Sequence, residues 1–169
     1  GWAAHAGITD LDGDLDLDIH VGGYDRFNGL RVYLGDNGGF NRYGPDMDGT
    51  IKLLDTQRKT LTPIQGAPEV HAEGQGGLLD VAVPPDFKPG DWIYFTFVRD
   101  SDFEGFTVLA RARLAGNKLV QWQDLLETQS ATTSGNHFGS RIAFDEAGHV
   151  YFGVGDRGDR PNSQDLGNH

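Results

Sequence analysis

Glycine is the residue that most limits what this chain can fold into. The 169 residues include 25 glycines, which together with Asp and Asn divide the sequence into short pieces. Because glycine destabilises helix interiors and is typical of turns, this spacing leaves little room for a long uninterrupted helix. The sequence therefore predicts an all-β protein of short strands joined by turns.

Four apolar segments follow a Pro/Gln/Gly-rich stretch at 62–77. They read LLDVAV, DWIYFTFV, FTVLARARL and LVQWQDLLE and are separated by turn sequences, which is the pattern of an antiparallel meander. In the second segment both alternating sets of side chains are apolar, with Phe95 on one face and Tyr94 on the other. A strand that is buried on both faces of an antiparallel sheet predicts stacked sheets, as in the four-stranded blades of a β-propeller.

Shorter strand pairs precede and follow this unit. LDIHVGG at 17–23 and LRVYLG at 30–35 form one predicted pair, and SRIAFD at 140–145 and VYFGVGD at 150–156 form another around the turn DEAGH. One pair, one full blade and half of another cannot close a ring. We therefore interpret the chain as an N-terminal fragment of a propeller or as a truncated, rearranged protein, and its open blade edges would favour self-association.

The composition excludes several classes of partner and site. There are 25 acidic and 14 basic residues, a net charge of −11, and no Lys/Arg cluster to neutralise a phosphate backbone, which argues against nucleic acid as a partner. Without cysteine the chain has neither a disulfide nor a thiolate metal site. No apolar run approaches the roughly 18 residues of a membrane span.

The last predicted hairpin brings a histidine and an aspartate together. If its two strands pair around the central turn, facing residues have numbers that sum to about 294. His137 then faces Arg157, which places Asp156 within side-chain reach at the same end of the sheet. An aspartate bound to one imidazole nitrogen fixes the tautomer and makes the other nitrogen a better base.

Two interpretations of this pair follow from spacing alone. The first is a catalytic pair beside a flat ligand, for which nearby glycines would leave the backbone uncrowded. The second is that His137 only caps a turn and Asp156 only closes a hairpin. The glycines in question are Gly135, Gly139 and Gly155.

Several motifs resemble those of a known enzyme family. GQGGLLDVAVPPDF at 74–87 and SGNHFGSRIAFDEAGHVYFGVGDRGDRPNSQDLGNH at 134–169 resemble the soluble quinoprotein aldose and glucose dehydrogenases, the glucose/sorbosone dehydrogenase family of six-bladed propellers. The resemblance covers residues 60–169, the second predicted domain. It implies a pyrroloquinoline quinone (PQQ) cofactor and oxidation of an aldose sugar at C1 to the lactone. It also implies an external electron acceptor and a periplasmic or secreted location.

The resemblance assigns roles to individual positions. His137 matches the general base that takes the C1 hydroxyl proton, Asp156 matches the aspartate that holds this histidine, and Gln75 matches a glutamine that contacts the quinone. Arg141 is expected to be a structural residue inside the sheet. The loop after Asp156 borders the substrate pocket in the family and contains Arg157, Arg160 and Asn162.

The first 59 residues resemble a different repeat. ITDLDGDLDLDIHVGG is similar to the calcium loops of integrin-type FG-GAP and VCBS propellers, and alternate carboxylates in a tight loop form the oxygen cage that Ca²⁺ favours. Leu15 replaces the usual glycine of such loops. The alternatives are an empty acidic turn for this segment and, for the whole chain, a non-catalytic calcium-stabilised module that binds carbohydrate or protein. The expected ligand positions are Asp10, Asp12, Asp14, Asp16 and Asp18.

Overall fold

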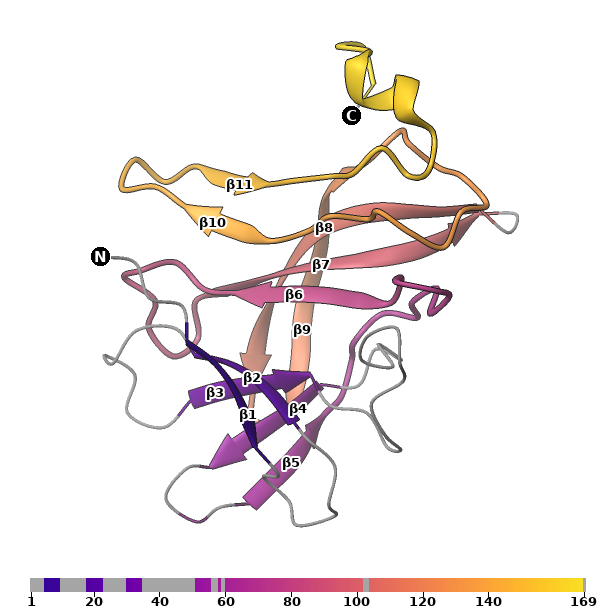
Figure 1. Ribbon diagram of the computed structural model, residues 1–169. Helices are drawn as coiled ribbons and strands as arrows, with labels where there is room; N and C mark the ends of the chain where they lie inside the picture. Colours follow the sequence, from indigo (N-terminus) through magenta and orange to yellow (C-terminus); the bar gives the residue numbers. More distant parts are fainter. Residues whose placement is uncertain are drawn as a thin grey trace.

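The described part of the chain is built of β-strands, in agreement with the all-β prediction (Figure 1). The computed structural model describes residues 5–9, 18–22, 30–34, 51–55, 58, 60–101 and 104–168, the first three ranges as backbone only. The predicted calcium-loop residues Asp10, Asp12, Asp14 and Asp16 lie outside these ranges, and Asp18 is the first residue of β2.

The N-terminal strands form a five-stranded antiparallel sheet in chain order. The predicted pairing of the segments at 17–23 and 30–35 is confirmed, because Ile19 of β2 lies opposite Leu34 of β3. Three strands of this sheet, β1, β4 and β5, were not expected from the sequence, and β5 overlaps the start of the Pro/Gln/Gly-rich stretch at 62–77. The edge position of β5 accommodates its proline, Pro63. The strands are β1 (His5–Thr9), β2 (Asp18–Gly22), β3 (Leu30–Leu34), β4 (Ile51–Asp55) and β5 (Thr60–Ile64).

The predicted four-stranded meander is confirmed as a second antiparallel sheet of order β6-β7-β8-β9. A bulge interrupts β6 between Leu78 and Asp80. Two residues two positions apart normally share a face of a strand, but the bulge leaves Leu78 in the apolar core and turns Asp80 toward the opposite layer. The strands are β6 (Leu78–Ala82), β7 (Trp92–Ser101), β8 (Glu104–Ala115) and β9 (Lys118–Glu127).

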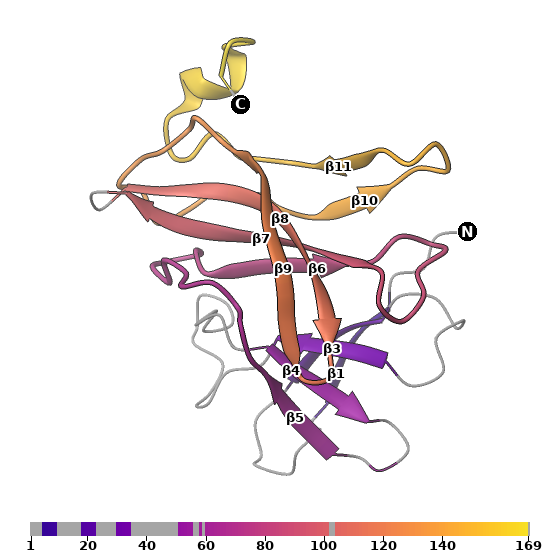
Figure 2. The same cartoon turned by 180° about the vertical axis from the view of Figure 1, so that it is seen from behind.

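The meander lies between two other layers, with the five-stranded sheet on one side and the hairpin β10–β11 on the other (Figures 1 and 2). This arrangement explains why β7 is apolar on both faces. Phe95 and Phe97 belong to one buried apolar cluster with Ile51 and Ile64 of the first sheet, whereas Tyr94 on the other face packs edge-on against Phe144 of the hairpin.

The hairpin consists of β10 (Ile142–Phe144) and β11 (Val150–Phe152) and has the predicted register. Its facing pairs include Ile142 with Phe152 and Phe144 with Val150, each summing to 294. A short 3₁₀ helix, Arg160–Gln164, follows. The register therefore sends the segments before β10 and after β11 to the same end of the hairpin, where His137 and Asp156 are found.

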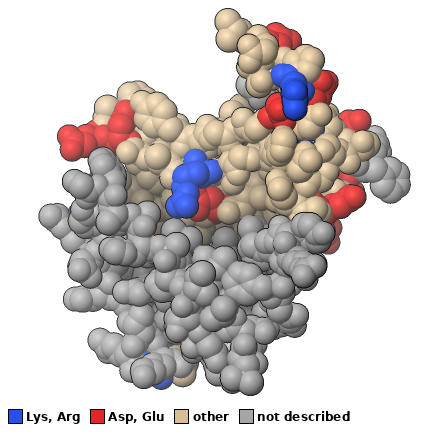
Figure 3. Space-filling model, viewed as in Figure 1, with Lys and Arg blue, Asp and Glu red and all other residues tan. Residues whose placement is uncertain are grey.

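No helix of the described residues is long and apolar enough to cross a membrane. The same residues contain no group of three or more His, Asp or Glu side chains placed to hold a metal ion. In the part of the surface described in Figure 3, Lys and Arg side chains form isolated spots among acidic and uncharged ones.

Candidate functional site

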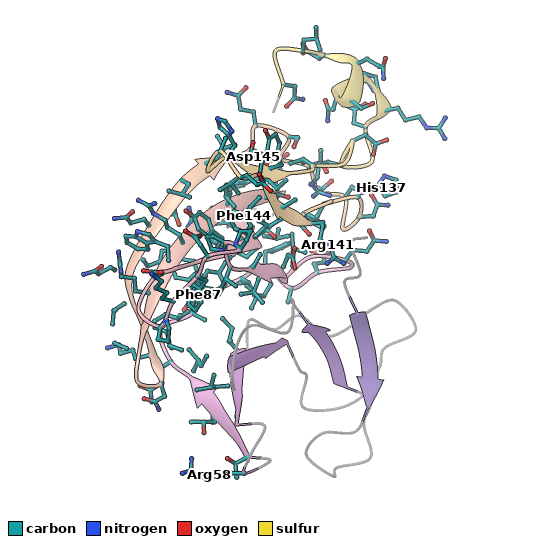
Figure 4. The ribbon with its side chains drawn as sticks, turned by 90° about the vertical axis from the view of Figure 1, so that its left-hand side faces the viewer. Arg58, Phe87, His137, Arg141, Phe144 and Asp145 are labelled. Carbon is teal, nitrogen blue, oxygen red and sulfur yellow. The ribbon has the colours of Figure 1, made fainter. Side chains whose placement is uncertain are left out.

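His137 and Asp156 form a hydrogen-bonded pair beyond the strand ends of the hairpin. The imidazole Nδ1 of His137 lies 2.7 Å from Oδ1 of Asp156. The imidazole is 55% exposed and the carboxylate 21%, so the histidine faces solvent while the aspartate lies behind it. Figure 4 shows His137 well separated from Asp145, which lies at the turn end of the same hairpin.

The charge state of Asp156 determines which imidazole nitrogen can act as a base. Hydrogen bonds from His137 and from the backbone N–H of Gly158 lower the pKa of Asp156, so this carboxyl is ionised at neutral pH. An ionised carboxylate only accepts hydrogen bonds, so Nδ1 of His137 carries the hydrogen that joins the pair. In the neutral imidazole, Nε2 then has the available lone pair.

Gln75 connects a second turn to this histidine. Its side-chain Oε1 accepts the backbone N–H of His137 at 3.0 Å, and its own backbone N–H donates to the carbonyl of Gly135 at 2.6 Å. The two turns touch so closely that a Cβ on Gly74 would lie 2.2 Å from the Gly135 oxygen. Gln75 and His137, 62 positions apart, are therefore neighbours at the surface.

The glycines around the pair are required by close packing of the backbone, and the approach of a flat ligand beside them remains a prediction. A Cβ on Gly155 would lie 2.2 Å from the carbonyl oxygen of His137, and one on Gly139 would lie 2.4 Å from that of Gly153. A Cβ on Gly135 would lie 3.3 Å from the Cα of Gly74. These positions are glycine because backbone segments pack directly on one another there.

Arg157, expected at the substrate pocket, is fully buried, with 0% of its surface exposed. Its guanidinium donates hydrogen bonds to the carbonyl oxygens of Asn136, Ser134 and Gly105. It also stacks on the ring of Phe138, with Cζ 3.4 Å from the ring centroid. Desolvation lowers the pKa of Arg157 to about 10, so the side chain remains charged at neutral pH.

The other arginines and the asparagine expected near the site take different places. Arg160 is exposed and its charge helps to lower the pKa of Asp156, while the side-chain nitrogen of Asn162 donates to the carbonyl of Asp156 at 3.3 Å. Arg141 was expected inside the sheet, but it precedes β10 and is exposed. It lies on the right-hand side of Figure 4, as His137 does. Pocket roles for Arg160 and Asn162 remain predictions.

Sequence reasoning did not identify the two groups that bind the backbone around His137. Gln75 was singled out only as a cofactor contact and Arg157 only as a pocket residue. One available signal was an arginine within a Gly/Asp loop directly after the aspartate of a predicted pair, at the position that the register places opposite His137. Only the packed structure shows that this arginine points inward.

The geometry can be compared with known proteins. The sequence profile of the family described as Glucose / Sorbosone dehydrogenase matches residues 45–169. The chain belongs to this family. Among curated relatives, the aldose sugar dehydrogenase YliI of Escherichia coli K12 is 36% identical over 108 residues, which are 62% of this chain and 29% of the relative. An uncharacterised Synechocystis protein is 36% identical over 95 residues, covering 56% of this chain and 23% of its own length.

Solved structures of family members match most of this chain. The soluble aldose sugar dehydrogenase of Escherichia coli in its apo-form superposes with a TM-score of 0.68 at 25% identity, covering 96% of this chain and 41% of that one. A glucose dehydrogenase matches with a TM-score of 0.69 at 27% identity and the same coverage. The likeness confirms the all-β fold with a four-stranded antiparallel sheet. This glucose/sorbosone dehydrogenase homologue spans less than half the length of the relatives it matches.

Proposed function

We propose that this chain supplies the proton-accepting part of a PQQ-dependent sugar dehydrogenase that oxidises an aldose at C1 to the lactone. The observation that supports this most directly is the solvent-facing His137, held through Nδ1 by the ionised Asp156. Family membership supports the choice of reaction, and the printed name of the E. coli relative supports an aldose substrate.

The residues of the chain perform the proton half of this reaction. Nε2 of His137 takes the proton of the C1 hydroxyl, and Asp156 stabilises the imidazolium that forms. The side chain of Gln75 lies exposed beside His137, and because its oxygen already accepts a backbone N–H, its amide NH₂ is the group that would contact the cofactor. PQQ, when bound, supplies the two-electron acceptor for the hydride that leaves C1.

The described residues offer the cofactor two side chains that can form hydrogen bonds. An exposed amide and an exposed imidazole stand on adjoining turns whose backbones are locked together, so both groups are held in place before a ligand arrives. This arrangement fits one edge of a polar, planar cofactor.

A calorimetric titration of PQQ into the purified chain tests the proposal. We expect saturable binding that weakens at least tenfold in a His137→Ala, Gln75→Ala double variant. The matched control is His149→Ala, because His149 forms a similar 2.7 Å pair with Asp145 at the other end of the hairpin. Absence of binding, or equal weakening by the control, would contradict the proposal and favour the non-catalytic module. Aldose turnover with a dye acceptor is assayed next.

The N-terminal aspartates are proposed to bind a structural Ca²⁺ in an FG-GAP/VCBS-like loop. The support is the alternate spacing of Asp10, Asp12 and Asp14 and the preference of Ca²⁺ for several carboxylate oxygens. We expect Ca²⁺ to raise the thermal unfolding temperature and EDTA to reverse the effect, and we expect an Asp12→Asn, Asp14→Asn variant to lose this response. An identical response in the variant would contradict the proposal.

A periplasmic or secreted location and an external electron acceptor are proposed with the reaction. Both rest on family membership. Fractionation of the cells that make this protein, followed by blotting for it, tests the location. Recovery only with cytosolic markers would contradict it.

A further inference from the structure

We infer that Arg157 is a positioning residue for His137, holding the backbone of the proposed base while Asp156 holds its ring. The inference rests on the proposed function only in that it calls His137 a base. The contacts themselves concern the orientation of His137, whatever reaction it serves. They involve the peptide bond that precedes His137 and an arginine with no exposed surface.

Both polar groups of this peptide bond are bound by side chains. The carbonyl of Asn136 accepts a hydrogen bond from Nη1 of Arg157. The N–H of His137 donates to Oε1 of Gln75 at 3.0 Å. A peptide bond is planar, so binding its oxygen from one direction and its hydrogen from another fixes the rotation of the whole unit.

The backbone conformation of His137 is itself unusual. His137 has a φ of +57°, in the left-handed region that side-chain-bearing residues seldom adopt. Such a conformation persists only where surrounding contacts over-determine it. Arg157 is itself at φ +55°, so two adjoining segments hold a disfavoured backbone conformation around one imidazole.

Arg157 also connects the loop that contains His137 to the four-stranded meander. Its Nη2 donates to the carbonyl of Gly105 in β8 at 3.0 Å and to that of Ser134 at 2.8 Å. The guanidinium face covers the ring of Phe138, the residue directly after His137. The residues on both sides of His137 are therefore fixed to the blade through one side chain.

The hydrogen bonds at this position require the guanidinium group of Arg157. The bound groups are carbonyl oxygens in different directions, which suit the planar fork of a guanidinium better than the compact ammonium of lysine. The buried Nε has no hydrogen-bond acceptor among the described residues. A buried charge with an unpaired donor is costly, and a role that demands the fork explains its presence.

The test compares Arg157→Met with Arg157→Lys in the same chain by NMR. Methionine keeps the packing on Phe138 but donates nothing. Loss of the hydrogen bond from Arg157 to the Asn136 carbonyl should release the peptide unit that presents the His137 N–H to Gln75. We therefore expect this amide proton to exchange about tenfold faster in Arg157→Met, about the effect of one hydrogen bond, and the pKa of Asp156 to move up toward its ordinary value. Arg157→Lys should fall between Arg157→Met and the unchanged chain.

The control is Arg111→Met, which removes another arginine stacked on an aromatic ring, that of Trp92 at 4.2 Å, away from the site. A merely structural Arg157 would lower the unfolding temperature without changing the His137 amide in the folded chain or, in the charge-conserving Arg157→Lys, the Asp156 pKa. That result would overturn the inference. If Arg157→Met does not fold, Arg157→Lys decides, and unchanged values in it would overturn the inference as well. Failure of the proposed function alone would leave these readouts unaffected.

Discussion

At the scale of single residues, the site depends on charges and backbone contacts that act on one imidazole. Asp156 binds the ring of His137, while Gln75 and Arg157 bind the peptide before it. Hydrogen bonds that involve an ionised partner are stronger than neutral ones. The ring and the backbone of His137 are thus restrained separately, so variants at these positions should have distinguishable effects.

Asp156→Asn should change how stability depends on pH. Because the pKa of Asp156 is lowered in the folded chain, the unfolded chain binds the proton more tightly, and the pair stabilises the fold above the ordinary aspartate pKa. This contribution is lost as the pH falls through the lowered value. Urea midpoints of the variant and the unchanged chain should differ most at pH 7 and converge in acid. A difference that stays constant into strong acid would contradict the assignment.

Gly155→Ala should destabilise the chain because a Cβ there would lie 2.2 Å from the His137 carbonyl oxygen. Overpacking of this kind costs about 1–3 kcal/mol, and the shift should be visible at the His137 amide by NMR. Gly153→Ala is the matched control, since nothing lies within 4 Å of a Cβ at that position. Equal free energies of unfolding for the two variants would show that the close backbone approach at Gly155 does not determine the stability of the chain.

At the scale of elements, the turn of the hairpin depends on one carboxylate. Asp145 accepts hydrogen bonds from the backbone N–H groups of Ala147 and His149, from the His149 ring and from the Tyr151 hydroxyl. These contacts lower the pKa of Asp145, and the carboxylate in turn raises the pKa of Tyr151. Asp145 thus organises the turn that sets the register of β10 and β11.

Asp145→Asn should lower the pKa of Tyr151 toward the ordinary phenol value, because the nearby negative charge is removed. The titration of the Tyr151 ring carbon followed by NMR measures this. Amide exchange at Ala147 should also become faster. Glu146→Gln is the control, since it removes the same charge from the adjacent exposed position. An unchanged Tyr151 titration in Asp145→Asn would show that the carboxylate does not govern the phenol.

The elements that the sequence predicts well are those defined by a continuous apolar segment or by a single turn. β7 and the hairpin around residues 146–148 fall in this class, and the register of the hairpin is enough to place His137 beside Asp156. β5 was missed because its proline and the glutamine and glycine after it read as a linker, although the structure places it at a sheet edge. The inward turn of Arg157 was missed because it depends on carbonyl groups contributed by distant segments.

At the scale of the whole molecule, buried polar side chains join the hairpin layer to the meander beside apolar contacts such as that of Tyr94 with Phe144. Thr96 and Thr107 donate from the meander to the carbonyl oxygens of Ser140 and Phe138. Asp80, turned by the bulge in β6, accepts the backbone N–H of Ile142 at 2.7 Å. The opposite interface, against the first sheet, is formed by an apolar core. The interface with the hairpin layer therefore combines buried hydrogen bonds with apolar packing.

Asp80→Ala should loosen the hairpin layer selectively. The change leaves the buried N–H of Ile142 without its acceptor, which costs about 1–3 kcal/mol, so amides of β10 and β11 should exchange faster while those of β7 and β8 keep their protection. Asp86→Ala, at an exposed position in the turn before β7, is the control.

Burial raises the pKa of Asp80, so the charged form costs stability as the pH rises through that range, opposite to the behaviour of Asp156. Asp80→Asn removes this cost and keeps one acceptor, so its free energy of unfolding should exceed that of Asp80→Ala. Equal losses in the two variants, or equally faster exchange in both interfaces, would show that Asp80 acts on the fold as a whole rather than as the link between the two layers.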